Sequence, residues 1–514
     1  MNYADLFRAT LPETALEVGA LVVLVVDLGF LRKSALNLRV AVAALLGVAG
    51  CTAALWMLPF QGMGFVYPGT GEMLLASGGS SAVAQIGILL LTVLTLLLLA
   101  DATFTQHVGE YVAVVLMAAA GGLLIAAAQD LLVIFVGLEL LSLGLYILTA
   151  FAKRSGKSAE AAIKYYLFGG MSAAFLLFGF SYLYGIAGST NLYRILLAVD
   201  GPQGAQAAPL LYVALVMIAA GLGFKVAAVP FHLWAPDTYE GAPAPAAAFI
   251  ASVSKVASFA LLILIGTAAL QVFEAIHVMA KYEPQAHIPA AHGFWGFSVS
   301  WSLILVVLAL ASMVLGNLAA LAQTSVRRLL AYSAIAHAGY MLLGLAYFSN
   351  ASRSAAAILY YVLTYGLTTI GAFGVVGAVE KAAGSDRLDA FLGLHKRNPL
   401  LAAVLLVLFL SLAGIPPLVG FWAKFNLFAA VLHASPTGMA LGLVILAVGM
   451  SAVSLYYYLQ VLKRAWVMPA VDETPIAVHP VTMAVLLLVS AGVVLLGCFP
   501  ALLQGWIAGF YPGM

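Results

Sequence analysis

Charged residues are scarce in this 514-residue chain, where they make up 8% of the sequence against about 25% in ordinary soluble domains. Hydrophobic residues reach 64%, and no polar stretch is long enough to form a separate soluble domain. The net charge is +2, and the basic residues are scattered through short connections. This pattern excludes a nucleic-acid-binding surface, which needs an organised basic patch.

Cysteine is almost absent as well. Cys51 and Cys498 lie in apolar runs, far from any Cys or His at metal-ligand spacing. The sequence also lacks a Gly-rich phosphate-binding loop, a cysteine cluster for an iron–sulfur centre and a nucleophile motif. His277, His287 and His292 share one long connection at a spacing that does not match a metal site. We therefore expect no redox cofactor and no metal on this chain.

Apolar runs of about 20 residues fill the sequence instead, and each is long enough to cross a bilayer as a helix. They predict an all-α polytopic membrane protein with about fourteen transmembrane helices in a single membrane domain, residues 1–514. The predicted spans are residues 11–31, 40–60, 81–101, 111–129, 131–152, 164–187, 209–235, 243–267, 298–320, 329–348, 354–378, 399–432, 437–462 and 481–508.

Basic residues in the connections predict the orientation. Fifteen of the 22 lysines and arginines follow odd-numbered spans, and four lie in connections on the opposite side. Because Lys and Arg collect on the cytoplasmic side of a membrane, the connections after odd-numbered spans are predicted to be cytoplasmic. Both termini are then predicted to face away from the cytoplasm.

Two stretches are too long for one straight span. Residues 209–241 and 399–432 contain 33 and 34 residues, which is about 50 Å of helix against a hydrocarbon core of about 30 Å. Pro230 interrupts the first stretch, and Gly414-Ile415-Pro416-Pro417 interrupts the second. We predict two discontinuous helices, because transporters use such breaks to line hydrated cavities near the middle of the membrane.

The two halves of the chain show a matching spacing of ionisable residues. Glu139 precedes Lys225 by 86 positions, and His337 precedes Lys424 by 87. The offset between the halves corresponds to five spans, and because five is odd we predict two inverted five-helix repeats. The predicted parts are residues 1–110 with spans 1 to 3, 111–267 with spans 4 to 8, 298–463 with spans 9 to 13, and 481–508 with span 14.

One glutamate and three lysines lie deep in apolar runs: Glu139, Lys225, Lys255 and Lys424. Burial without a partner favours the neutral form of each group, whereas an ion pair between Glu139 and Lys225 keeps both charged. A lysine that switches between these conditions can carry a proton. The structural alternatives are that Glu139 fixes helix packing through a hydrogen bond and that the lysines extend toward the membrane surface.

Two histidines are candidate proton relays, because imidazole exchanges protons near neutral pH. His232 follows Pro230 by two residues, and His337 lies in the tenth predicted span. A single histidine of this kind is, however, more often a buried residue with satisfied hydrogen bonds. Asp237 and Glu240 precede span 8, where they either cap a helix or take up protons.

The stretch from Gly223 to Lys255, GFKVAAVPFHLWAPDTYEGAPAPAAAFIASVSK, resembles the signature of the proton-translocating, antiporter-like membrane subunits of respiratory complex I. Within that family it is most similar to the subunit N branch of the bacterial NADH-quinone oxidoreductases. Three further motifs fit this branch: GLELLS from Gly137, YSAIAHAGY from Tyr332 and SLAGIPPLVGFWAKF from Ser411. Subunit M is expected to have Glu where Lys424 stands, and subunit L is expected to add a long lateral helix.

This resemblance implies that Glu139 and Lys225 form the pair of a first half-channel, that Lys255 connects the halves and that Lys424 is the exit-side residue. The implied function is proton translocation in the bacterial inner membrane, driven by quinone reduction elsewhere in the complex. NADH, FMN, iron–sulfur clusters and quinone are expected on partner subunits, with subunit M and the small subunit K as neighbours. Two alternatives stay open: a subunit of a stand-alone cation/proton antiporter of the same fold, and a purely structural scaffold.

Overall fold

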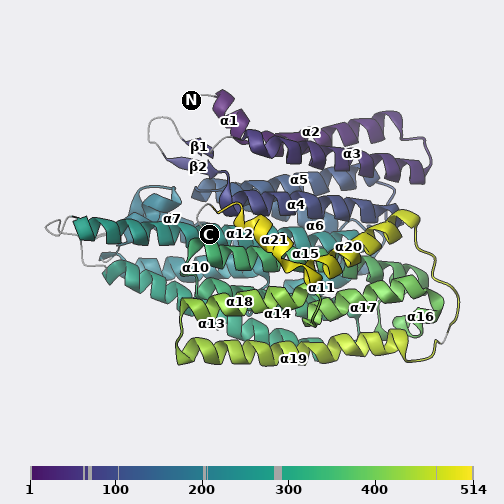
Figure 1. Ribbon diagram of the computed structural model, residues 1–514. Helices are drawn as coiled ribbons and strands as arrows, with labels where there is room; N and C mark the ends of the chain where they lie inside the picture. The colour runs from purple at the N-terminus through teal and green to yellow at the C-terminus, as the bar shows by residue number, and fades with distance from the viewer. Residues whose placement is uncertain are drawn as a thin grey trace.

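The computed structural model describes residues 3–61, 64–66, 72–101, 103–200, 204, 206–282, 292–470 and 472–511, without the side chains of residues 3, 64, 200, 275–282 and 292–299. Long helices lie side by side in this part of the chain (Figure 1). Twelve of them are long and apolar enough to cross a membrane, counted over the described residues. The prediction of a helical, multi-span membrane protein is confirmed.

The chain begins with α1 (Tyr3–Ala9), α2 (Leu11–Val25), the π-helix η1 (Val26–Phe30), α3 (Leu36–Met57), the 3₁₀ turn η2 (Leu58–Phe60), α4 (Gly79–Leu97) and the 3₁₀ turn η3 (Leu98–Asp101). The next group is α5 (Val108–Ala127), α6 (Leu131–Thr149), α7 (Gly156–Ala187), α8 (Leu192–Asp200), α10 (Ala208–Val226), α11 (Trp234–Gly241) and α12 (Ala244–Tyr282). The third group is α13 (His292–Leu321), α14 (Val326–Ala346), α15 (Ala351–Ala383), η4 (Leu388–Phe391), α16 (Leu394–Arg397), α17 (Pro399–Ala413), α18 (Val419–Ala434) and α19 (Gly438–Trp466). The described part ends with α20 (Pro480–Cys498) and α21 (Pro500–Ala508).

Side-chain caps fix the start of several helices. The Asp130 carboxylate accepts a hydrogen bond from the Leu132 backbone N–H at the start of α6. Ser155, Ser325 and Asn398 cap α7, α14 and α17 in the same way. Each cap satisfies a backbone donor that has no partner within its own helix. The polar residues between the apolar runs therefore set where these helices begin.

Both predicted helix breaks are present. The first helix stops at Val226, where Ala227 adopts the left-handed conformation with φ 59°, and helical structure resumes at Trp234. The second stops at Ala413, where Gly414 has φ 88° and α18 begins at Val419. A left-handed residue ends a helix and leaves its last carbonyls without intrahelical partners. These carbonyls become available to other groups inside the bundle.

The lysines lie on opposite sides of the two breaks. Lys225 is the penultimate residue of α10, whereas Lys424 lies within α18, beyond the second break. The equal spacing of 86 and 87 residues therefore does not mark equivalent places in the two broken helices. The inverted repeat stays a prediction, with which the order of helices in α5–α12 and α13–α19 is consistent.

A two-stranded antiparallel hairpin lies between α3 and α4, and the sequence analysis did not predict it. Its strands are β1 (Gly64–Val66) and β2 (Met73–Ala76). The Asn191 side chain donates hydrogen bonds to the carbonyls of Met73 (2.8 Å) and Gln129 (3.4 Å), so the hairpin is tied to the ends of the neighbouring helices.

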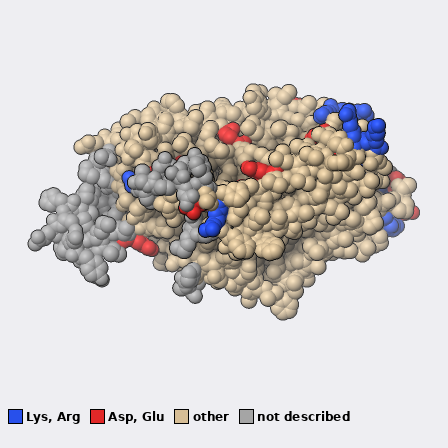
Figure 2. Space-filling view, turned by 90° about the horizontal axis from the view of Figure 1, so that it is seen from above, with Lys and Arg blue, Asp and Glu red and all other residues tan. Residues whose placement is uncertain are grey.

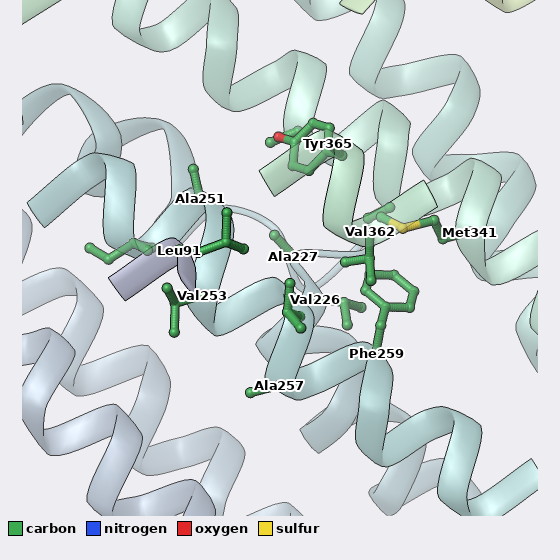
Figure 3. Packing of buried hydrophobic residues seen from close by; sticks show 14 of the residues in the cluster. Leu91, Val226, Ala227, Ala251, Val253, Ala257, Phe259, Met341, Val362 and Tyr365 are labelled. Carbon is green, nitrogen blue, oxygen red and sulfur yellow. The ribbon is translucent and has the colours of Figure 1, made fainter. Parts of the chain in front are cut away.

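The interior of the bundle is formed by α12, α14 and α15. In the most apolar window of α14, 94% of the residues are buried, compared with 28% for α19 at the periphery. Figure 3 shows the packing around the first break, where side chains from several helices converge. They include Leu91 of α4, Val226 of α10, Phe259 of α12, Met341 of α14 and Val362 of α15. The start of the first break, from Ala227 to Val229, is therefore buried, whereas Pro230 and Leu233 farther along are exposed.

The visible face in Figure 2 is mostly uncharged, with acidic side chains scattered over it and the largest group of basic side chains near one end. In Figure 1 the α2–α3 and α19–α20 connections lie at the right, whereas α1 and the end of α21 lie toward the left.

We expect a reporter fused after Arg154 or Arg397 to be cytoplasmic and one fused after Met514 to be external. Alkaline phosphatase and fluorescent-protein fusions measure this directly, and a cytoplasmic fusion at Met514 would show that a span has been miscounted.

Candidate functional site

Lys255 of α12 occupies the centre of the site, with 3% of its surface exposed. Its Nζ donates hydrogen bonds to the carbonyls of Ala334 (2.7 Å) and Val226 (3.3 Å). The Val226 carbonyl is the last of α10, and the C-terminal end of a helix carries a partial negative charge that favours an ammonium group. Lys255 thus connects the first helix break to α14.

Lys225 directly precedes Val226, the residue whose carbonyl Lys255 contacts. Its Nζ donates a hydrogen bond to the Ser142 hydroxyl of α6 (2.5 Å) and lies 5.6 Å from the centre of the Phe224 ring. The Ser142 hydroxyl in turn donates to the Leu138 carbonyl. Lys225 therefore has a hydroxyl partner that the sequence analysis did not identify.

The direct ion pair expected between Glu139 and Lys225 is not present among the ion pairs of the described residues. Glu139 lies one helical turn before Ser142 on α6, and its charge still acts on Lys225 through space. The serine takes the position of closest contact instead. Ser142 follows Glu139 by three residues, which puts both side chains on one face of α6. This spacing is the sequence signal that could have identified Ser142.

Lys424 shows the same kind of contact at the second break. Its Nζ donates to the carbonyls of Leu412 (3.1 Å) and Ala413 (2.9 Å), the last two residues of α17, and to the Ser451 hydroxyl of α19 (2.8 Å). The ring centre of Tyr340 lies 5.6 Å away. Lys255 and Lys424 thus each contact the C-terminal end of a helix that stops inside the bundle.

His337 lies between these two lysines. It is 4% exposed, its Nδ1 lies 2.7 Å from the Tyr361 hydroxyl, and it is close enough to Lys255 and Lys424 for both charges to act on it. Ala334, His337 and Tyr340 lie on three successive turns of α14. The Ala334 carbonyl contacts Lys255, and the Tyr340 ring contacts Lys424. A cavity with room for roughly one water molecule borders His337 and Tyr361.

Comparisons with known proteins show the family of this chain. The family model for transmembrane proteins of the NADH:quinone oxidoreductase/Mrp antiporter class matches residues 128–281 and 288–451. NADH-quinone oxidoreductase subunit N 2 of Acidobacterium capsulatum is 48% identical over 520 residues, and the alignment covers 99% of each chain. The chain belongs to the NADH-quinone oxidoreductase subunit N family.

A solved structure also supports the assignment to this family. A chain of respiratory complex I from Thermus thermophilus with bound aureothin is 34% identical to this subunit N family member, with a TM-score of 0.74 and coverage of 96% of this chain and 98% of that chain. A chain of the Mrp complex from Dietzia sp. has a TM-score of 0.78 at 21% identity, and the match covers 98% of this chain and 51% of that chain. The second likeness shows a shared fold alone.

His232 is a relay candidate of this subunit N family member for which the structure shows no contact with Lys225, Lys255 or Lys424 among the described residues. It lies in the first break, is 6% exposed, and its Nδ1 has no hydrogen-bond partner among the described residues. No hydrogen bond joins it to a lysine in the same part of the chain. Its role as a relay stays a prediction.

Asp237 and Glu240 lie in α11 and form ion pairs with basic residues of two other helices. Asp237 pairs with Lys164 of α7 (2.7 Å) and Arg328 of α14 (2.6 Å), and Glu240 pairs with Lys157 (2.9 Å) and Arg328 (3.1 Å). Burial alone raises the pKa of Asp237, but the hydrogen bonds from Lys164 and Arg328 outweigh it and lower the pKa. These carboxylates hold α7, α11 and α14 together.

We expect Asp237→Asn to lower the stability of the protein by about 1 kcal/mol near neutral pH, because both ion pairs are lost. Since the folded pKa of Asp237 is lowered, its stabilisation is present above the unfolded pKa and disappears as the pH falls below it. Thermal unfolding in detergent at neutral and acidic pH measures this, with the exposed Asp389→Asn as control. An equal loss at both pH values would contradict the assignment.

A cavity of about 420 Å³ opens beside this ion cluster. Acidic and basic side chains both line it, and most of them form ion pairs: Asp101 with Lys381, Glu240 with Lys157 and Glu380 with Arg327. Ala244, the first residue of α12, also lines it, and Lys255 follows eleven residues later on the same helix. The cavity thus places ion-paired side chains at the start of the helix that carries the central lysine.

Metal binding finds no support in the described part of the chain, where no group of three His, Cys, Asp or Glu residues is placed to hold an ion. His287 and the side chains of His277 and His292 lie outside the described residues.

Proposed function

We propose that this subunit N family member translocates protons in the membrane arm of an NADH-quinone oxidoreductase, along the residues Glu139, Lys225, Lys255, His337 and Lys424. The observation that carries the proposal is the position of Lys255, whose ammonium contacts both the residue after Lys225 and the turn of α14 before His337. Lysines are costly inside a membrane and usually mark an ion path there. The names of the full-length relatives support the same activity.

The contacts explain how each lysine can hold a proton without a carboxylate beside it. Lys255 and Lys424 bind carbonyls at helix ends, which stabilise an ammonium group but do not neutralise it as an ion pair would. A proton held in this way can be released when a neighbouring charge changes. His337 is close enough to Lys255 and Lys424 for both charges to act on it. A proton on either lysine therefore disfavours a second proton on His337. Protons then move singly along the line.

Other subunits of the complex carry its cofactors and contact this chain. NADH, FMN, the iron–sulfur clusters and quinone belong to partner subunits, and subunits M and K are the neighbours in a bacterial inner membrane, with both termini on the periplasmic side. The outer helices α7 and α19 are the natural contact surfaces, because only 33% and 28% of their apolar windows are buried within the chain. The cavity beside α11, which is lined by ion pairs, is assigned to proton uptake on the cytoplasmic side.

The alternative function is that of a subunit in a stand-alone cation/proton antiporter, because the matching family model covers both NADH:quinone oxidoreductases and Mrp antiporters. Co-purification from the native membrane separates the two. Flavin and iron–sulfur subunits that stay with this chain through a detergent gradient support the oxidoreductase assignment, and a complex free of both contradicts it.

We expect Lys424→Ala to reduce proton transfer about tenfold or more while the complex still assembles. The side chain fills the space between the end of α17 and Ser451, so its removal takes away the proton site and leaves the helices in place. The proton-to-electron ratio in sealed vesicles measures the effect, with the exposed Lys396→Ala as a matched control. A normal ratio in Lys424→Ala removes this residue from the path.

A further inference from the structure

Each lysine beside a helix break donates a hydrogen bond to a serine on another helix. Ser142 of α6 accepts from Lys225 at 2.5 Å, and Ser451 of α19 accepts from Lys424 at 2.8 Å. Lys255, in contrast, has hydrogen bonds to backbone carbonyls alone among the described residues. The outer lysines therefore share a kind of partner that the central lysine lacks.

The orientation of the Ser142 hydroxyl is fixed by its second bond. Its proton is donated to the Leu138 carbonyl, four residues earlier on α6, so the oxygen lone pairs remain for Lys225. Ser142 is 3% exposed, and water therefore does not compete freely for this position. Ser451 is held similarly, because it also donates to the Ala413 carbonyl, at 3.4 Å, which Lys424 contacts as well.

We propose that Ser142 and Ser451 are positioning residues that set how firmly Lys225 and Lys424 hold a proton. The proposal rests on the proposed function, in which these lysines carry protons. An oxygen fixed as an acceptor favours the ammonium form over the neutral amine, because hydrogen bonds to a charged donor are stronger. The two serines thus make the outer lysines better proton acceptors than their burial alone would allow.

Other groups near the lysines are unchanged in serine variants. Glu139 of α6 acts on Lys225 through space, and Tyr146 lies close to both Glu139 and Ser142. Around Lys424 the corresponding groups are His337 and Tyr340, both on α14. No charged group is removed with either serine, so a shift in the serine variants reflects loss of the hydroxyl and its hydrogen bonds, which for Ser142 include one with Tyr146.

The test uses the intact complex in sealed vesicles, with NADH oxidation and proton pumping followed from acidic to alkaline pH. In Ser142→Ala and Ser451→Ala we expect the alkaline limb of the pumping profile to move to lower pH by about one unit, since a charge-assisted hydrogen bond is lost. Ser142→Thr and Ser451→Thr keep the hydroxyl and should restore most of the wild-type profile.

Two matched controls distinguish positioning from packing. Ser172 donates to the Gly221 carbonyl of the helix that carries Lys225 (3.0 Å), and Ser454 donates to the Ser451 carbonyl (2.6 Å). Ser172→Ala and Ser454→Ala remove buried hydrogen bonds nearby without touching a lysine, so their profiles should stay in place. An unshifted profile in Ser142→Ala and Ser451→Ala, or an equal shift in the controls, overturns the inference.

Lysine variants in the same vesicles show which proposal fails. If Lys225→Ala and Lys424→Ala lose pumping while the serine variants keep the wild-type profile, the role of the serines is wrong and the proposed function stands. If the lysine variants pump normally, the proposed function is wrong, and the inference falls with it.

Discussion

Lys255→Met is expected to lower proton pumping about a hundredfold, the size of effect seen when a positioned proton-transfer group is removed. Methionine keeps an unbranched side chain of similar length, so the packing of α12 against α14 and α15 is preserved. The Val226 and Ala334 carbonyls lose their ammonium partner. Because a blocked proton step holds back the coupled redox step, NADH oxidation should fall together with pumping.

The measurement combines NADH oxidation with a pH-gradient dye in sealed vesicles that contain the complete complex. Lys463→Met, at an exposed position near the end of α19, serves as the control and should keep both activities. Assembly is checked by gel filtration of the solubilised complex. Wild-type pumping in an assembled Lys255→Met complex would exclude this lysine from the path and favour the scaffold interpretation.

Glu139→Gln is expected to lower pumping and NADH oxidation together, by about tenfold near neutral pH. The substitution keeps the shape of the side chain and removes its charge. Lys225 then retains the Ser142 hydroxyl but loses the negative charge that favours its ammonium form. Lys225 should therefore release its proton more readily, and proton loading should fail first at the alkaline end of the range.

Two variants control this experiment. Glu139→Asp keeps the charge on a shorter side chain and should retain more activity than Glu139→Gln. Arg194→Gln removes the ion pair with Glu72, in a segment predicted to be external, and should change neither activity. Equal pumping by the Gln variant and the wild type would show that Glu139 serves packing and that the proton path lies elsewhere.

The sequence was sufficient to predict the features that depend on local chemistry. The lengths of the apolar runs predicted the helices, and Pro230 and Gly414 predicted the two breaks, because proline and a left-handed glycine end a helix wherever it packs. The depth of Lys255 followed from its position within an apolar run, and the structure places it in the interior.

The contacts of the site depend on how helices rotate and approach one another, which no short pattern specifies. The missing ion pair between Glu139 and Lys225 illustrates this, since the orientation of α6 brings Ser142 to Lys225 instead. Ser451 and Tyr361 were missed for the same reason, because each meets its partner across a helix interface. The short hairpin at Gly64–Val66 and Met73–Ala76 gave no recognisable strand signal, because its strands are too brief to show an alternating pattern.

The central claim is that Lys225, Lys255, His337 and Lys424 form one continuous proton path. A density map of the intact complex in lipid, at a resolution that shows ordered water, tests it most directly. We expect waters or hydrogen-bonding side chains to join each of these residues to the next, including a water in the cavity beside His337 and Tyr361. Tightly packed apolar side chains that separate Lys255 from Lys424, with no water between them, would contradict it.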